Sequence, residues 1–193
     1  MAGEMVVWYP FVKRVIDVAG AVCGLLVTFL LYLPLAVAIR LNSPGPVIFS
    51  QERMGRDCRV FRIHKFRTMR LEAPGYGPKP DADDERVTSV GRFLRRTSLD
   101  EFPQFWNVLR GEMSLVGPRP EQLAFIGKYD AWQMRRFIAK PGLTGWWQVN
   151  GRPQPLYDHI EYDIHYVEHR SLRLDLLILL RTARAVLSGE GAC

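Results

Sequence analysis

The N-terminal part of the chain contains one long apolar segment. Residues 18–39 form an uncharged run of 22 residues, and no other run of this kind occurs. As a straight helix it would extend ~33 Å, which is enough to cross a hydrocarbon core of about 30 Å. The run is longer than the apolar region of a secretory signal, and no small-residue cleavage site follows it before Arg40. The pattern therefore predicts a membrane segment that is retained.

Pro34 interrupts this segment. Its ring clashes with the carbonyl four residues earlier, which predicts a kink or break near residues 30–33. The flanks carry the cations Lys13, Arg14 and Arg40, and the positive-inside rule places both flanks on the cytoplasmic side. These features favour a re-entrant hairpin that enters and leaves the membrane on one face. A kinked helix that spans the membrane, with a short N-terminus outside, remains open on these residues alone.

The composition beyond residue 41 is that of a soluble domain. A turn signal at residues 43–46 precedes two predicted strands, residues 47–51 and 59–66, around a glycine turn at 55–57. These strands are expected to form a β-hairpin. Residues 73–84 are rich in Pro, Gly and Asp, which predicts an exposed loop. We therefore divide the chain into a membrane-associated segment, residues 1–41, and a cytosolic catalytic domain, residues 42–193.

Helical patterns dominate the rest of the chain. They predict helices over residues 86–96, 103–109, 129–140 and 171–187. Ser98 and Glu101 have the spacing of a capping box, although Pro103 complicates it. In the last helix leucines recur at helical spacing, with arginines away from them. Core packing is the simpler reading of these leucines, and a position in the membrane interface is the alternative. The expected fold class is α+β and mainly helical, with interfacial amphipathic helices.

Charge is concentrated in one part of the chain. The formal net charge is +6, and residues 51–70 alone hold seven lysines and arginines against two acids. Such a cluster favours a polyanionic partner, which could be nucleic acid, an anionic membrane or a compound carrying phosphate. The three cysteines have no C-x-x-C spacing and cannot all pair, which argues against a disulfide framework and fits a reducing compartment.

Candidate phosphate chemistry rests on cations and one acidic pair, because the chain has neither a P-loop nor a Rossmann glycine motif. Lys65 and Arg67 follow a predicted strand, and Arg119 lies between two prolines. Asp100 and Glu101 are adjacent at a predicted helix start, where a carboxylate stays ionised. Such a pair could bind Mg²⁺, and such a carboxylate could attack phosphorus. An H-x-x-E-H match at residues 165–169 is discounted as a zinc site because little chain remains to supply a further ligand.

The order of its motifs resembles that of the bacterial sugar transferase family, the monotopic polyprenyl-phosphate phosphoglycosyl transferases. The resemblance covers nearly the whole chain. It rests on NSPGPV at 42–47, QERMG at 51–55, KFRTM at 65–69, LRRTSLDE at 94–101, MSLVGPRP at 113–120, PGLTG at 141–145 and QVNGR at 148–152. Phe102, where leucine is more usual, and the Asp57-Cys58 turn depart from the family pattern. The early start of the membrane segment resembles the short members of the family.

The resemblance implies a reaction and its participants. A nucleoside-diphosphate sugar, with UDP as the usual nucleotide, would transfer its sugar phosphate to polyprenyl phosphate, with Mg²⁺ as cofactor. Asp100 would be the nucleophile that forms a covalent phosphosugar intermediate, and Glu101 would assist through the metal or in proton transfer. We expect Lys65, Arg67 and Arg119 to bind the diphosphate, together with Gln148 and Arg152. The implied location is the cytoplasmic face of the bacterial inner membrane, where the transfer would begin glycan or exopolysaccharide assembly among membrane lipids.

Two other function classes remain open on the residues: a noncatalytic membrane scaffold and a membrane-tethered nucleic-acid-binding protein. A membrane-tethered nucleic-acid-binding protein would use the basic cluster at residues 53–70 and show strongly salt-dependent affinity. That reading gives Asp100 and Glu101 no role, so we expect no nucleic-acid partner. The sequence decides neither which sugar is transferred nor whether the chain forms a homo-oligomer.

Overall fold

The computed structural model describes residues 2–71, 84–150 and 159–188, and the side chains of residues 2–7 are not described. The predicted loop at 73–84 therefore lies almost entirely outside the described residues. The helices are α1 Ala2–Asn42, α2 Ser89–Arg96, α3 Phe105–Arg110, α4 Leu123–Ile126, α5 Trp146–Asn150, α6 Glu161–His169 and α7 Leu172–Ser188, with short 3₁₀ helices η1 Arg56–Cys58, η2 Leu99–Gln104 and η3 Gln133–Ile138. The strands are β1 Ile48–Met54, β2 Val60–Phe66, β3 Ser114–Val116, β4 Glu121–Gln122 and β5 Gly142–Thr144. The mainly helical α+β class is confirmed.

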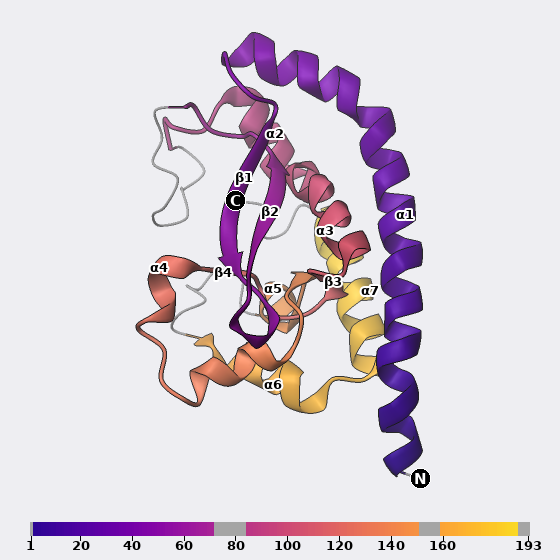
Figure 1. Ribbon diagram of the computed structural model, residues 1–193. Helices are drawn as coiled ribbons and strands as arrows, with labels where there is room; N and C mark the ends of the chain where they lie inside the picture. Colours follow the sequence, from indigo (N-terminus) through magenta and orange to yellow (C-terminus); the bar gives the residue numbers. More distant parts are fainter. Residues whose placement is uncertain (1, 72–83, 151–158, 189–193) are drawn as a thin grey trace.

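Helix α1 runs along one side of the molecule and bends in its second half (Figure 1). Of the predicted kink or break, the structure has a bend without a break, because helical structure continues through Pro34 to Asn42. Thr28 donates a hydrogen bond to the carbonyl of Gly24 at 2.7 Å, a contact that favours bending in helices. Among the described residues, α1 is the one helix long and apolar enough to cross a membrane, by length and composition.

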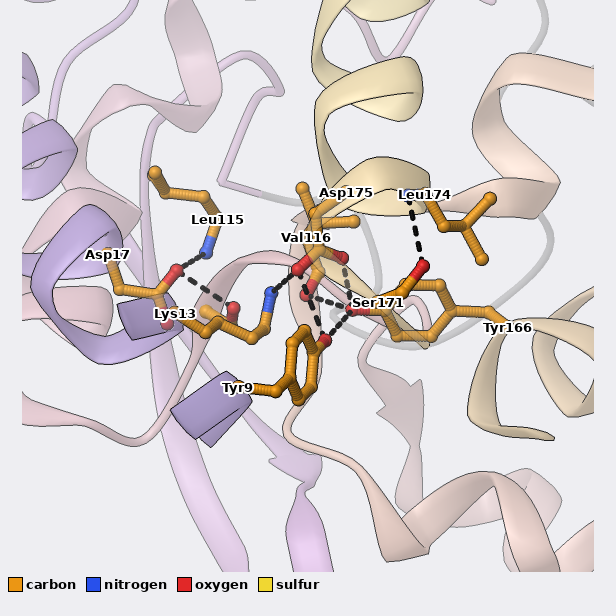
Figure 2. A network of polar contacts seen from close by, with 10 residues as sticks. Tyr9, Lys13, Asp17, Leu115, Val116, Tyr166, Ser171, Leu174 and Asp175 are labelled. Atoms are coloured by element: carbon orange, nitrogen blue, oxygen red, sulfur yellow. Dashed lines mark hydrogen bonds and ion pairs between the residues drawn. The ribbon is translucent and has the colours of Figure 1, made fainter. Parts of the chain in front are cut away.

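A polar network fastens the first half of α1 to the rest of the protein (Figure 2). Lys13 forms an ion pair with Asp175 of α7 at 2.9 Å, and Asp175 also accepts a hydrogen bond from Tyr166 of α6 at 2.7 Å. One turn further along α1, Asp17 accepts hydrogen bonds from the Ser114 hydroxyl and the Leu115 amide of β3, each at 2.9 Å. The start of α1 is therefore attached to α6, α7 and β3 together.

The predicted β-hairpin is confirmed. Strands β1 and β2 pair antiparallel from Ile48–Phe66 to Met54–Val60, and β4 adds two residues to the other edge of β1. A second sheet, the parallel pair β3 and β5, was not predicted. It depends on a close approach at Gly117, where a Cβ would stand 2.2 Å from the carbonyl oxygen of Lys140. Because only glycine fits there, the motifs at residues 113–120 and 141–145 can approach and pair.

Three small apolar clusters form the core. Their buried members are Val116, Ala139, Tyr166, Val167 and Ile178 in the first; Ala21, Ile63, Val108 and Met113 in the second; Ile39, Val47, Phe66 and Leu94 in the third. Helix α1 contributes Ala21 and Ile39, one to each of two clusters. Although the sequence sets α1 apart as a membrane segment, its inner face packs as part of the same core.

Several predicted helix details are wrong. Ser98 does not cap a helix through its side chain, because it adopts the left-handed conformation with φ 56°. The helix expected over 103–109 is divided into η2, which contains Pro103, and α3. The helix expected over 129–140 is only the 3₁₀ helix η3, in which Arg136 is fully buried rather than opposite the apolar side. Local patterns could not reveal this, because the partners of Arg136 lie on other elements.

Helix α7 is confirmed, and its leucines divide between the core and the surface: Leu174 and Leu179 pack against the first core cluster. Its buried residues are Asp175 and Ile178, whereas Leu176 is 58% and Leu180 62% exposed. The core-packing reading is therefore wrong for these leucines. The buried side of α7 combines the apolar contacts of Ile178 with the ion pair between Asp175 and Lys13 of α1.

Candidate active site

The acidic pair lies in the first turn of η2, between α2 and α3. The left-handed Ser98 reverses the chain after α2, and Thr88 caps that helix by accepting a hydrogen bond from the Gly91 amide at 2.9 Å. Helix α2 can approach the end of β2 closely because a Cβ at Gly91 would stand 2.0 Å from the Thr68 carbonyl oxygen. These turns bring Asp100 and Glu101 against β2.

Asp100 is a buried carboxyl group surrounded by cations. Asp100 is 8% exposed. Burial raises the pKa of its carboxyl group to about 6, and the nearby Glu101 adds to this increase. Lys65, Arg95 and Arg119 oppose the shift electrostatically. These three cations favour the ionised form, in which the carboxylate can act as a nucleophile. It is neither isolated in an apolar interior nor remote from positive charge.

A small pocket brings together residues from separate motifs. Lys65, Glu101 and Arg119 line it, and Arg53, Gln104 and Leu143 are among its other lining residues. Lys65 donates to Glu101 at 2.6 Å. Arg119 lies over the Trp147 ring at 5.9 Å from the ring centroid. Asp100 is not a lining residue and lies next to the pocket through its neighbour Glu101. The pocket combines cations and a carboxylate, which suits a phosphate-bearing ligand together with a metal.

Among the described residues, two other predicted phosphate ligands, Arg67 and Gln148, do not line this pocket. Arg67 is buried and donates to the Ser43 hydroxyl at 3.0 Å and to the Pro44 carbonyl at 2.8 Å. It therefore clamps the turn after α1 onto the end of β2, and it is not among the pocket residues. Gln148 is buried in α5, and neither polar atom of its side-chain amide has a hydrogen-bond partner. Arg152 lies outside the described residues.

Two cations near the acidic pair were not predicted as site residues. Arg95 of α2 donates to the Thr68 hydroxyl at 3.0 Å and acts electrostatically on Asp100. Arg53 of β1 lines the pocket. Both stand inside motifs that carry the family resemblance, at 94–101 and 51–55, and this position was the signal that could have identified them.

Two carboxylates are the acidic metal ligands that this site could offer. No group of three or more His, Cys, Asp or Glu side chains suited to a metal occurs within the part of the chain that the structure describes. Mg²⁺ is commonly held by one or two carboxylates together with substrate phosphates, so Asp100 and Glu101 fit that ion. In the H-x-x-E-H segment, Glu168 pairs with Arg135 at 2.9 Å and His165 stacks on Trp146.

We expect Asp100→Asn to melt at a higher temperature than the unmodified protein at pH 7.5 without divalent metal. The folded pKa of about 6 exceeds the usual 3.8, so ionisation opposes folding as pH rises through 6. A neutral amide avoids this cost, which is of the order of 1–3 kcal/mol. The gain should disappear toward pH 4, where both proteins are neutral at this position. Thermal melts in detergent with EDTA measure it.

Asp57→Asn is the matched control for that experiment. Asp57 is exposed and adopts a left-handed conformation that asparagine tolerates, so its melting temperature should not change. Equal melting of Asp100→Asn and the unmodified protein at pH 7.5 would contradict the burial of a charged carboxylate.

Comparison with known proteins identifies relatives along nearly the whole chain. The sequence profile described as bacterial sugar transferase matches residues 8–189. A UDP-N-acetylgalactosamine-undecaprenyl-phosphate N-acetylgalactosaminephosphotransferase of Aeromonas hydrophila is 45% identical over 95% of this chain and 45% of its own length. A UDP-glucose:undecaprenyl-phosphate glucose-1-phosphate transferase of Escherichia coli is 40% identical over 88% of this chain and 39% of its own.

A shorter relative matches over most of both chains. An uncharacterized sugar transferase, EpsL of Bacillus subtilis, is 42% identical over 93% of this chain and 89% of its own. In contrast, the chain spans less than half the length of the Aeromonas and Escherichia relatives. With the family profile matched over nearly all of the sequence and the motif residues gathered at one pocket, this chain belongs to the bacterial sugar transferase family.

Proposed function

We propose that this protein transfers a sugar phosphate from a UDP-sugar to undecaprenyl phosphate or a closely related polyprenyl phosphate. The observation that carries the proposal is the buried Asp100, which interacts electrostatically with Lys65, Arg95 and Arg119 and is the neighbour of the pocket residue Glu101. The printed names of the Aeromonas and Escherichia relatives, which join a UDP-sugar to undecaprenyl phosphate, support the choice of substrates.

The proposed reaction has two displacements at one phosphorus atom. First, a carboxylate oxygen of Asp100 attacks the phosphorus that bears the sugar, and the bond to the bridging oxygen breaks. UMP leaves with that electron pair, and the phosphosugar remains on Asp100 as an acyl phosphate. Second, a phosphate oxygen of the polyprenyl phosphate attacks the same phosphorus and restores the carboxylate. Covalent catalysis of this kind lets the soluble donor leave before the lipid acceptor reacts.

Lys65 and Arg119 are the proposed diphosphate ligands because both line the pocket beside Glu101. Fixed cations of this kind stabilise the charge that develops on the leaving phosphate. Glu101 is hydrogen-bonded to Lys65, which fixes the position of that ammonium group. Arg53, which lines the pocket, and Arg95, which acts electrostatically on Asp100, add positive charge to the site.

Mg²⁺ is the proposed cofactor, and Asp100 and Glu101 are the residues that would hold it. When bound, the ion would neutralise phosphate charge and so make the phosphorus easier to attack.

The proposed location is the cytoplasmic face of the bacterial inner membrane, with α1 re-entrant and α7 in the membrane interface. Exposed apolar side chains support this placement. Along α1, Leu26, Phe29, Leu30 and Leu33 are between 61% and 80% exposed, and α7 exposes Leu176 and Leu180. Large apolar surfaces of this kind are rare on soluble monomers and mark contact with lipid or another protein.

Cysteine labelling can test this topology. On a chain whose natural cysteines are replaced by serine, we expect Phe11→Cys and Leu41→Cys to react with an impermeant maleimide from the same, cytoplasmic side. Both residues are exposed and flank the apolar run. Arg184→Cys on α7 should also react, whereas Leu176→Cys should be protected by lipid. Reaction of positions 11 and 41 from opposite sides would establish a spanning helix instead.

The decisive functional experiment measures UMP release by the purified full chain. A panel of UDP-sugars is incubated with undecaprenyl phosphate and Mg²⁺ in detergent, which also identifies the preferred sugar. We expect release for at least one sugar and ping-pong kinetics. No release from any of them, combined with salt-dependent binding of nucleic acid, would favour the alternative class.

A further inference from the structure

A cluster of buried charged side chains contacts the backbone of Arg119. At its centre is Arg136 of η3, whose side chain is fully buried. It is paired with Asp163 of α6, also fully buried, with Nε at 3.0 Å from the carboxylate. Its Nη1 lies 3.2 Å from Glu121 of β4. One guanidinium thus joins three elements that are distant in the sequence.

The cluster is costly, and stability alone does not explain it. Taking charges out of water costs several kcal/mol per ion, and buried pairs are often no more stabilising than well-packed apolar side chains. One oxygen of Asp163 has no hydrogen-bond partner at all. A better explanation is geometric, because the planar guanidinium with its five donors holds several acceptors in fixed positions.

The same guanidinium fixes the backbone of the pocket arginine. Arg136 Nη2 donates to the carbonyl oxygen of Arg119 at 2.7 Å. On the other side of this turn, the Pro118 carbonyl accepts from the Gly142 amide at 2.8 Å and the Gly117 amide donates to the Thr144 carbonyl at 2.9 Å. Because both neighbours of Arg119 are prolines with fixed φ, the orientation of its carbonyl is the main freedom left in this turn. Arg136 removes that freedom.

We infer that Arg136, held by Asp163 and Glu121, is a positioning residue that sets the place of the Arg119 guanidinium in the pocket. The inference rests on the proposed function, in which Arg119 binds the donor diphosphate. Arg136 is fully buried and does not line the pocket, so its effect reaches the substrate only through Arg119. The buried charges therefore order the turn around Arg119 before the substrate binds.

A double-mutant cycle tests this assignment. Arg136→Lys keeps a positive charge for Asp163, but an ammonium group cannot also bind Glu121 and the Arg119 carbonyl in a planar fork. We expect kcat/KM for the UDP-sugar to fall roughly 10- to 100-fold, as for other misplaced binding groups. In the Arg119→Ala background the same change should cost less than about twofold, because the two residues act as one unit. A merely structural role would give the same fold loss in both backgrounds.

Further variants keep the test decisive. Arg136→Met combined with Asp163→Leu and Glu121→Gln removes all three buried charges together. It should melt near the unmodified protein while showing the same loss and the same dependence on Arg119. Arg135→Lys is the matched control, because Arg135 is exposed and pairs with Glu168, and it should keep full activity. Full activity of Arg136→Lys, or equal losses in both backgrounds, would overturn the inference.

Binding of UDP alone, measured by calorimetry on the same four proteins, distinguishes failure of the proposed reaction from failure of the positioning role. If the unmodified protein releases no UMP, the proposed reaction fails. Coupling between positions 136 and 119 in UDP affinity would still support the positioning role, and its absence would refute it.

Discussion

Asp100→Asn is expected to lose UMP release by at least about 10³-fold, the scale seen when a catalytic nucleophile is removed. An amide has nearly the shape of the carboxylate but cannot attack phosphorus. Since the group is buried beside Lys65 and Arg95, those cations should still be in place to bind the donor. The variant should therefore bind UDP-sugar and fail in the chemical step.

The covalent intermediate gives this prediction a second measurement. With UDP-sugar and Mg²⁺ but no lipid acceptor, the unmodified protein should accumulate about one phosphosugar per chain, detectable by intact mass. Asp100→Asn should show none, and Asp57→Asn, altered at an exposed site, should behave as the unmodified protein. Near-normal turnover in Asp100→Asn, or phosphosugar mapped to Glu101, would remove the assignment of the nucleophile.

Lys65→Met is expected to reduce kcat/KM by roughly 10²- to 10³-fold, the effect of removing one preorganised donor from a developing charge. Its ammonium group lines the pocket, contacts Glu101 at 2.6 Å and acts on Asp100. Methionine keeps the length of the side chain and removes only the charge and the hydrogen bonds. The loss should therefore be electrostatic rather than a packing defect.

Arg62→Met is the matched control for Lys65→Met. Arg62 belongs to the same strand, and its side chain is 64% exposed beside Glu52. A surface pair of this kind contributes little, so activity should stay within about twofold of the unmodified protein. If Lys65→Met and Arg62→Met lose activity equally, the total positive charge of β2 would explain the effect. The specific role of Lys65 would then be refuted.

The limits of prediction from the sequence can be seen at particular residues. The hairpin β1–β2 was predictable because alternation and a glycine turn are local signals. The residues Lys65 and Arg119 were predictable because they stand in motifs, and the pocket brings them together. Arg67 shares a motif with Lys65, yet only the fold shows that it clamps Ser43 and Pro44. Lys65 and Arg67 are two residues apart and would share a face if the strand continued, but β2 ends at Phe66. The direction of Arg67 is therefore set by its contacts with the turn after α1, which the motif does not record.

By itself, the sequence determined the apolar segment at residues 18–39, the basic cluster, the acidic pair and the family, because each is written in residue type and spacing. Tertiary structure alone decided what those residues do to one another. It gave Asp100 its raised pKa through burial and joined the buried Arg136 to the Arg119 backbone. It also placed Asp175 of α7 against Lys13 and left Leu176 and Leu180 exposed. The physical reason is that burial, electrostatic coupling and backbone approach depend on distances between segments far apart in the chain, and spacing along the sequence does not contain those distances.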